Sequence, residues 1–318
     1  MSDYSLKTIR DQFRAQGIFY TPPELAHFIM TLIPENAKRV YDPTCGRGSL
    51  LSVFGDDVAK YGQDIDAAAV SDAEKRLINF HGAIGDVLSD AVFIDERFDA
   101  IVANPPFSIK WHGRADGYFA FAPTIPSPSK ADFAFIIHIL WMLSDDGTAV
   151  VLNSPGIGYR GGREQILRQW LVEQNVIDKV IHIPGNTFTD TNIATLCLVL
   201  RKNRNTKDVQ FIDREHTLER MVTHAEIAGK EYSLSVSHYL QPIVEKPTID
   251  ERGLEMLSRS AAVSRIKSEL AFSQLVSAIS GYNIRDFVED IRKALDEFEA
   301  TLPVLDDNAI INTEENNV

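Results

Sequence analysis

The tetrapeptide Asn104-Pro105-Pro106-Phe107 has residue types that could activate an aromatic amine, and it directly follows an apolar run at 98–103 that is typical of a buried strand. Such an amine is a poor nucleophile because its lone pair is delocalised into the ring. The side-chain oxygen of Asn104 and the carbonyl oxygen of Pro105 can each accept one N–H bond, which localises the lone pair. The prolines fix φ, and Phe107 offers a flat face for a base to stack on. The structural alternative is a rigid Pro-Pro turn.

A second pattern, Asp42-Pro43-Thr44-Cys45-Gly46-Arg47-Gly48, lies between a predicted strand and the helix expected after it. Gly46 and Gly48 allow a tight turn and a close approach of the backbone to a ligand. Asp64 lies 18 positions after Gly46, a spacing typical of a carboxylate that binds ribose hydroxyls. Asp86 follows the next predicted strand and could accept a hydrogen bond from an adenine amino group. Ile65 and Val87, which follow these two carboxylates, complete the predicted cofactor site.

The loop could hold an adenine dinucleotide or S-adenosyl-L-methionine. The third glycine of the dinucleotide fingerprint is missing, because position 51 is Leu51. Asp42 would repel a pyrophosphate and favours a cationic ligand, so S-adenosyl-L-methionine, with its sulfonium and ammonium groups, fits better. Transfer of a methyl group from a sulfonium is a direct displacement in which positioning matters more than an added base. The eight histidines and two cysteines show no metal-ligand spacing, so we expect no metal site.

Strands and helices alternate along the chain, which predicts an α/β fold with a doubly wound, mostly parallel, Rossmann-like sheet. We predict strands at 38–42, 58–64, 98–103, 148–153, 176–183, 193–201 and 208–213, with one more before Asp86. We predict helices at 6–13, from Pro22, and at 48–54, 67–80, 131–143, 163–174, 249–279 and 284–302. In such a sheet, ligands bind beyond the carboxyl ends of the strands, which is where the residues above are placed.

Three regions follow from this pattern. Residues 1–36 hold N-terminal helices, and the family resemblance described below implies that they include a segment that closes over the cofactor; residues 37–213 form the predicted catalytic methyltransferase domain. Residues 214–318 form a C-terminal helical extension, in which we expect two long helices to dock another subunit and the tail from Asp306 to be disordered.

The amino-acid composition and the net charge exclude several classes of protein. The chain has 318 residues, 44% of them hydrophobic, which is enough for a large core. Two cysteines exclude a disulfide scaffold and suit a reducing cytoplasm, where we expect the protein. The longest apolar run, 133–143, is too short to span a membrane. A formal charge of −13 is unusual for a chain that grips nucleic acid alone, so a DNA substrate would require a partner to supply much of the binding.

The order of these motifs resembles a known family. Phe19-Tyr20-Thr21-Pro22 is followed by DPTCGRG, GQDID, GDVL and NPPF, as in the N6-adenine methyltransferases of the γ arrangement. More narrowly, the chain resembles the modification (M) subunit of type I restriction-modification systems. Segments 131–135, 159–164, 183–188 and 191–195 agree, and the similarity covers residues 17–202 strongly.

The resemblance implies an S-adenosyl-L-methionine-dependent, adenine-specific DNA methyltransferase that acts on a flipped adenine and works with a separate specificity subunit. It also implies the roles of individual residues. Tyr20, Thr21 and Pro22 would close over the methionine end of the cofactor, and Asp42, Thr44 and Gly46 would form its main binding loop. Asp64 would bind the ribose and Asp86 the adenine, while Asn104 and Phe107 would be the catalytic pair.

Several alternatives remain open at this point. A protein glutamine N5-methyltransferase uses a similar tetrapeptide, and a catalytically inactive methyltransferase-like scaffold would keep the same fold. Such M subunits usually carry a longer N-terminal region than the residues that precede Tyr20, which weakens the expectation that this chain clamps DNA. Arg160 and Arg163 could contact phosphate or lie solvated in a loop, and residues 108–130 could order around an extruded base.

Overall fold

The computed structural model describes residues 21–185, 194–242, 251–281 and 283–301. The helix predicted at 6–13, Tyr20 and the tail from Asp306 lie outside the described residues, as does most of the 183–195 motif region. The chain divides into two compact units, Met1–Ile243 and Val244–Val318, which we treat separately.

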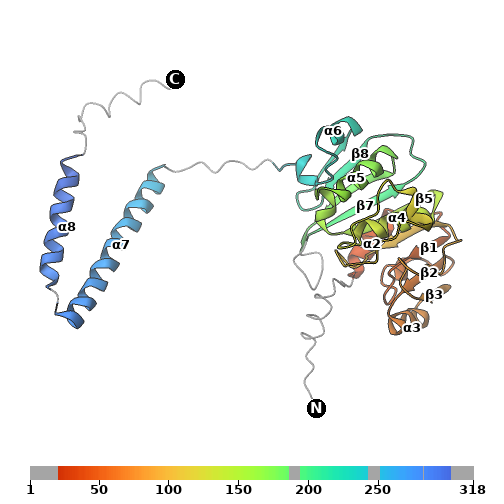
Figure 1. Ribbon diagram of the computed structural model, residues 1–318, viewed down its shortest axis with the longest axis horizontal. Helices are drawn as coiled ribbons and strands as arrows, with labels where there is room; N and C mark the ends of the chain where they lie inside the picture. The colour runs from red at the N-terminus through yellow and green to blue at the C-terminus, as the bar shows by residue number, and fades with distance from the viewer. Residues whose placement is uncertain (1–20, 186–193, 243–250, 282, 302–318) are drawn as a thin grey trace, which may run out of the picture. The chain divides into compact units, whose positions relative to one another are not determined.

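The first unit is built on one sheet that is nine-stranded in the described residues, with the order β3-β2-β1-β4-β5-β7-β6-β8-β9 (Figure 1). Strands β1 to β6 and β8 run parallel, and β7 and β9 are antiparallel to their neighbours. The predicted doubly wound, mostly parallel sheet is therefore confirmed. The strands are β1 (Arg39–Asp42), β2 (Ala59–Asp64), β3 (Phe80–Ile84), β4 (Phe98–Ala103), β5 (Leu143–Asn153), β6 (Ile177–Ile183), β7 (Thr195–Arg201), β8 (Val209–Asp213) and β9 (Leu218–Val222).

Helices cover both faces of this sheet, and alternate residues of the central strands explain why. Val40 and Ala100 belong to one buried apolar cluster, whereas their neighbours Tyr41 and Ile101 belong to another. Since successive side chains of a strand point to opposite faces, each cluster is the core on one side of the sheet. The α-helices of this unit are α2 (Pro23–Thr31), α3 (Ala67–Arg76), α4 (Asp132–Met142), α5 (Arg163–Glu173) and α6 (His224–Gly229). Single 3₁₀ turns are η1 (Leu51–Val53), η2 (Gly117–Phe121), η3 (Pro155–Gly158) and η5 (Val236–His238).

Two helix predictions differ from the structure. The helix expected at 48–54 is reduced to the short turn η1, because Gly46 and Gly48 adopt φ of +49° and +79° and keep the chain in turns. The helix expected at 67–80 ends at Arg76, since Asn79, at φ +57°, turns the chain into β3.

The first unit also extends past residue 213, where the C-terminal extension was predicted to begin. Strand β9 pairs with β8, and α6 packs beside α5, so the compact unit continues to Ile243. Sequence periodicity missed both elements because they are only five and six residues long.

The second unit holds two helices, α7 (Glu251–Ser280) and α8 (Ile284–Glu299), separated at Gly281, which has φ +72°. On α8 the apolar residues recur at helical spacing, yet Leu295 and Phe298 are 54% and 62% exposed. Within the described part of the chain, every helix falls short of the length or apolarity that a membrane span requires.

Candidate active site

A cavity of about 670 Å³ opens at the carboxyl ends of β1, β2 and β4. The sheet order reverses between β1 and β4, and this is the position where open α/β sheets bind ligands. The volume lies within the range of small-molecule sites. Eleven predicted site residues line the cavity: Thr21, Asp42, Pro43, Thr44, Gly46, Asp64, Ile65, Asp86, Val87, Asn104 and Pro106.

Four predicted site residues lie elsewhere, and Tyr20 is outside the described residues. Pro22 is the N-cap of α2, Pro105 is buried, and Gly48 shapes the turn behind the cavity wall. Phe107 is half-buried and packs against the apolar cluster on the α2 side of the sheet. The stacking role predicted for Phe107 therefore stays a prediction.

Carboxylates hold the loop between β1 and β2 in shape before any ligand binds. The backbone N–H of Thr44 donates to Asp42 Oδ1 at 3.0 Å. The Asp64 carboxylate accepts the N–H of Gly46 at 2.7 Å and that of Asp66 at 3.0 Å, which ties the end of β2 to the glycine turn. The spacing of 18 residues between Gly46 and Asp64 therefore coincides with a direct contact, and the ribose-binding role expected of Asp64 stays a prediction.

Asp42 is unusual because its side chain is buried on the cavity wall, where the residue is 2% exposed. Burial raises its pKa to about 8, the hydrogen bond from Thr44 opposes that rise, and the charge of Asp64 adds to it. A cation placed beside Asp42 would restore the ionised form, so the electrostatics of this wall favour a positively charged ligand.

The far end of the cavity is formed by the turn after β3. Asp86 accepts hydrogen bonds from the N–H of Leu88 and from the hydroxyl of Ser89, both at 3.0 Å. Segment 108–130 packs over this turn, since the Tyr118 hydroxyl donates to the carbonyl of Val87 at 3.3 Å. Much of the aromatic content of the segment is turned inward, as in the contact between Trp111 and Phe119, whose ring centroids are 5.0 Å apart.

Asn104 comes directly after β4 and faces the same cavity. Its Nδ2 donates to the hydroxyl of Thr21 at 3.1 Å, which fixes the orientation of the amide. Because the amide group is planar, a contact that holds Nδ2 also limits the directions that Oδ1 can take. The arrangement therefore brings an oriented acceptor and three carboxylates, Asp42, Asp64 and Asp86, to one cavity.

Sequence reasoning missed part of the lining. Most of the missed residues lie within five positions of a predicted one, so wider motifs would have included them. They are Cys45, Arg47, Ser49, Leu50, Asp66, Gly85, Leu88, Ile109, Lys110, Trp111 and His112. Ala69, Pro128 and Phe135 also line the cavity. Pro128 gave no local signal, because a long-range bond from the N–H of Trp111 to its carbonyl, 3.0 Å long, brings it there.

Arg160 and Arg163 occupy different environments. The Arg160 side chain is 20% exposed and donates to both carboxylate oxygens of Glu164 at 3.2 Å and to Ser154 Oγ at 2.7 Å. Arg163 is exposed. Arg160 is therefore not a solvated loop charge, whereas Arg163 is open to solvent.

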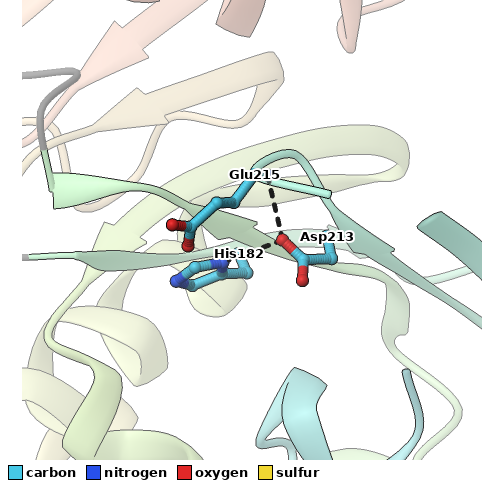
Figure 2. Close-up of side chains that lie close together, drawn as sticks. All are labelled: His182, Asp213 and Glu215. Carbon is cyan, nitrogen blue, oxygen red and sulfur yellow. Dashed lines mark hydrogen bonds and ion pairs between the residues drawn. The ribbon is translucent and has the colours of Figure 1, made fainter. Parts of the chain in front are cut away.

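Figure 2 shows a separate cluster at the ends of β6 and β8, made by His182, Asp213 and Glu215, whose ligating atoms lie within 4.8 Å of one another. Asp213 Oδ1 is 3.1 Å from His182 Nδ1 and accepts the N–H of Glu215 at 2.9 Å. Its Oδ2 is 2.8 Å from His216 Nδ1, and this hydrogen bond raises the pKa of His216. Asp213 Oδ1 thus joins the ends of β6 and β8, while Oδ2 contacts the turn after β8, and the expectation of no metal site stays a prediction.

The chain is similar to known proteins in sequence and in structure. Residues 3–221 match the model of the family described as N-6 DNA Methylase. The chain is 30% identical to the methylase subunit of the type I restriction enzyme MpnII of Mycoplasma pneumoniae, over 94% of this chain and 62% of that protein. It is 25% identical to the MjaVII methylase subunit of Methanocaldococcus jannaschii, over 74% of this chain and 52% of that protein.

A solved structure is similar to this chain in fold. The crystal structure of the type I restriction-modification system methyltransferase subunit of Streptococcus thermophilus aligns with a TM-score of 0.65 and 26% identity, over 70% of this chain and 59% of that chain. Our chain spans between about half and two thirds of the length of these three relatives. The family model matches more than half of the chain and confirms the resemblance drawn from the motifs; the chain belongs to the N-6 DNA methylase family.

Proposed function

We propose that this chain transfers the methyl group of S-adenosyl-L-methionine to the N6 amino group of adenine in DNA, as the modification subunit of a type I restriction-modification system. One observation carries the proposal: the oriented amide of Asn104 shares a cavity with Asp42, Asp64 and Asp86. Membership of the N-6 DNA methylase family and the names of the relatives support it.

The cavity fits this cofactor chemically. Its three carboxylates would repel a pyrophosphate but suit a ligand that carries a cation and hydroxyl donors. The buried hydroxyl of Thr44 has no hydrogen-bond partner among the described residues, so a ligand can supply one. When bound, the cofactor supplies a methyl group that is activated by its sulfonium.

Each wall of the cavity has a proposed role. We assign Asp42, Thr44 and Gly46 to the methionine end, with the Tyr20-Thr21-Pro22 segment closing over it. Asp64 and Ile65 would hold the ribose, and Asp86 and Val87 the adenine of the cofactor. Asn104 Oδ1 and the carbonyl of Pro105 would accept the two N–H bonds of a flipped target adenine, which makes its nitrogen more nucleophilic.

The test is transfer of a labelled methyl group from the cofactor to DNA, with and without the specificity subunit of the same system. Asn104→Ala is expected to lower transfer by about 10²- to 10³-fold, the loss typical of one removed transition-state contact. Cofactor binding, measured by calorimetry, should stay within a few-fold. Label that appears in protein instead would indicate a glutamine methyltransferase, and an absence of any transfer would indicate a scaffold.

We also propose that a separate specificity subunit reads the DNA sequence and packs on α7 and α8. The net charge of −13 is unfavourable for a protein that binds phosphates unaided. Apolar side chains of α7 are widely exposed in the described residues, with Leu257 at 72% and Ile279 at 80%. Such stripes are typical of helices that pack against partner helices.

A further inference from the structure

Ser108, the residue directly after the catalytic tetrapeptide, adopts φ +54°. This left-handed conformation is disfavoured for a residue with a Cβ atom and persists where surrounding contacts determine it. The contacts around Ser108 therefore decide where the Asn104–Phe107 turn lies relative to the cavity.

Asp132 holds the backbone of Ser108. Its Oδ1 accepts the N–H of Ser108 at 3.3 Å and the hydroxyl of Ser154 at the same distance. Asp132 is the first residue of α4 and is 2% exposed. A buried carboxylate in this position is favoured by the positive end of the helix dipole.

Arg160 holds the side chain of Ser108. Its Nη2 donates to Ser108 Oγ at 3.1 Å and to Ser154 Oγ at 2.7 Å, while its Nη1 lies 3.7 Å from Asp132 Oδ2. The two serines, the carboxylate and the guanidinium thus form a closed ring, which we call the Ser108 clamp: Ser108, Asp132, Ser154 and Arg160.

The position of Arg160 is itself determined from two sides. Glu164, which is 5% exposed, accepts from Nη1 through both carboxylate oxygens. The guanidinium lies against Gly156, where an added Cβ would be 2.3 Å from Nε. The clamp joins the end of β4, the start of α4, the end of β5 and the turn before α5, all at the catalytic edge of the sheet.

We propose that Asp132 and Arg160 are positioning residues for methyl transfer, which act through Ser108 to hold the Asn104–Phe107 turn in its reactive place. This inference rests on the proposed function for its kinetic consequence. The alternatives are that Arg160 contacts a DNA phosphate or that the clamp serves fold stability alone.

The experiment compares Arg160→Lys and Asp132→Asn with Arg163→Lys, a matched change at an exposed arginine three residues away, at the start of α5. Lysine keeps the charge of Arg160 but lacks the planar fork, in which Nη2 donates to both serines while Nη1 donates to Glu164. Hydrogen exchange is measured for peptides that cover 104–110, together with kcat at saturating DNA and cofactor, cofactor Kd, and DNA Kd against salt.

We expect exchange at the Ser108 amide to become at least about tenfold faster in both clamp variants, because its hydrogen bond opens more often. We expect kcat to fall about 10- to 100-fold while cofactor Kd stays within about threefold. Arg163→Lys should match the wild type in exchange and kcat.

Other outcomes overturn the inference. Unchanged exchange in folded clamp variants shows that the clamp does not hold the turn, whether or not the wild type methylates DNA. Faster exchange with unchanged kcat shows that the position of the Asn104–Phe107 turn does not limit the rate of methyl transfer. If the Arg160 variant binds DNA more weakly and with a smaller salt dependence, while exchange and kcat are unchanged, Arg160 is a phosphate contact. A wild type without transfer to DNA rejects the proposed function, and the exchange data still report on the clamp.

Discussion

The hydroxyl of Thr21 lies 3.1 Å from Nδ2 of Asn104, although 83 positions separate the two residues. Thr21 precedes α2 and is 8% exposed, so the bond joins the N-terminal segment to the catalytic turn in a protected place. The threonine therefore both lines the cavity and contacts the amide of Asn104.

Removing the Thr21 hydroxyl should slow catalysis through Asn104. Thr21→Val keeps the shape of the side chain but removes the hydroxyl, and we expect kcat to fall about tenfold, because one hydrogen bond is worth roughly 1 kcal/mol. Thr21→Ser keeps the hydroxyl and is the control, with kcat expected within about threefold of the wild type. Equal rates in the two variants, measured by methyl transfer to DNA, would show that the bond does not orient the amide.

Asp42 should make cofactor affinity depend on pH. Its pKa of about 8 in the free protein means that it is mostly protonated at pH 7. A cationic cofactor favours the ionised form, so binding at pH 7 should release close to one proton. Affinity should rise with pH up to about 8 and level off above it. Calorimetry in buffers of different ionisation enthalpy measures the released proton, and Asp42→Asn, which cannot titrate, should release none.

The parts of this site that could be predicted from sequence are those encoded by local patterns. The strand at 98–103 was predicted at its observed limits because a run that is apolar except for Asp99 fits a strand buried on both faces. The spacing of Gly46 and Asp64 placed both residues in the predicted cofactor site, and both line the cavity, but the hydrogen bond between them was not predicted. The Ser108 clamp was not predictable, because Asp132 and Arg160 reach Ser108 through tertiary packing, and no periodicity encodes that.

The two glycines of the cofactor loop should respond differently to substitution by alanine. Both adopt positive φ, so each variant is strained. At Gly46 an added Cβ meets nothing within 4 Å and enters the cavity, whereas at Gly48 it would lie 2.5 Å from Leu77 Cδ1. Gly46→Ala should therefore raise cofactor Kd more, and Gly48→Ala should lower Tm more. Calorimetry measures the cofactor Kd of both variants, and thermal unfolding measures their Tm. A larger rise in Kd for Gly48→Ala, or a larger drop in Tm for Gly46→Ala, would contradict the prediction.

His138 should make the protein less stable in acid. It is fully buried beside the hydroxyl of Tyr41, 3.3 Å away, and burial lowers its pKa to about 3. An unfolded histidine titrates near 6.5, so between these values the unfolded state binds one more proton. The stabilisation is complete above about pH 6.5 and is lost as pH falls toward 3, by on the order of a few kcal/mol.

The measurement is urea unfolding of His138→Met and wild type across this pH range. Met fills the site without titrating, so the difference in unfolding free energy between the two proteins should change with pH below 6.5 and stay constant above it. A constant difference throughout would mean that His138 titrates alike in the folded and unfolded states.

The apolar face of α8 should be needed for assembly rather than for folding of the chain. Ile291 is half-buried. Leu295 and Phe298 lie on the same face of the helix, and they are 54% and 62% exposed. Leu295→Asp places a charge where a partner helix would exclude water, whereas Lys293→Asp puts the same residue in the same turn on the charged face.

We expect the Leu295→Asp variant to lose co-purification with the specificity subunit and the Lys293→Asp variant to retain it. Cofactor binding should be unchanged in both, because the cavity belongs to the other unit. Equal retention of the subunit by the two variants would place the docking surface elsewhere on the chain.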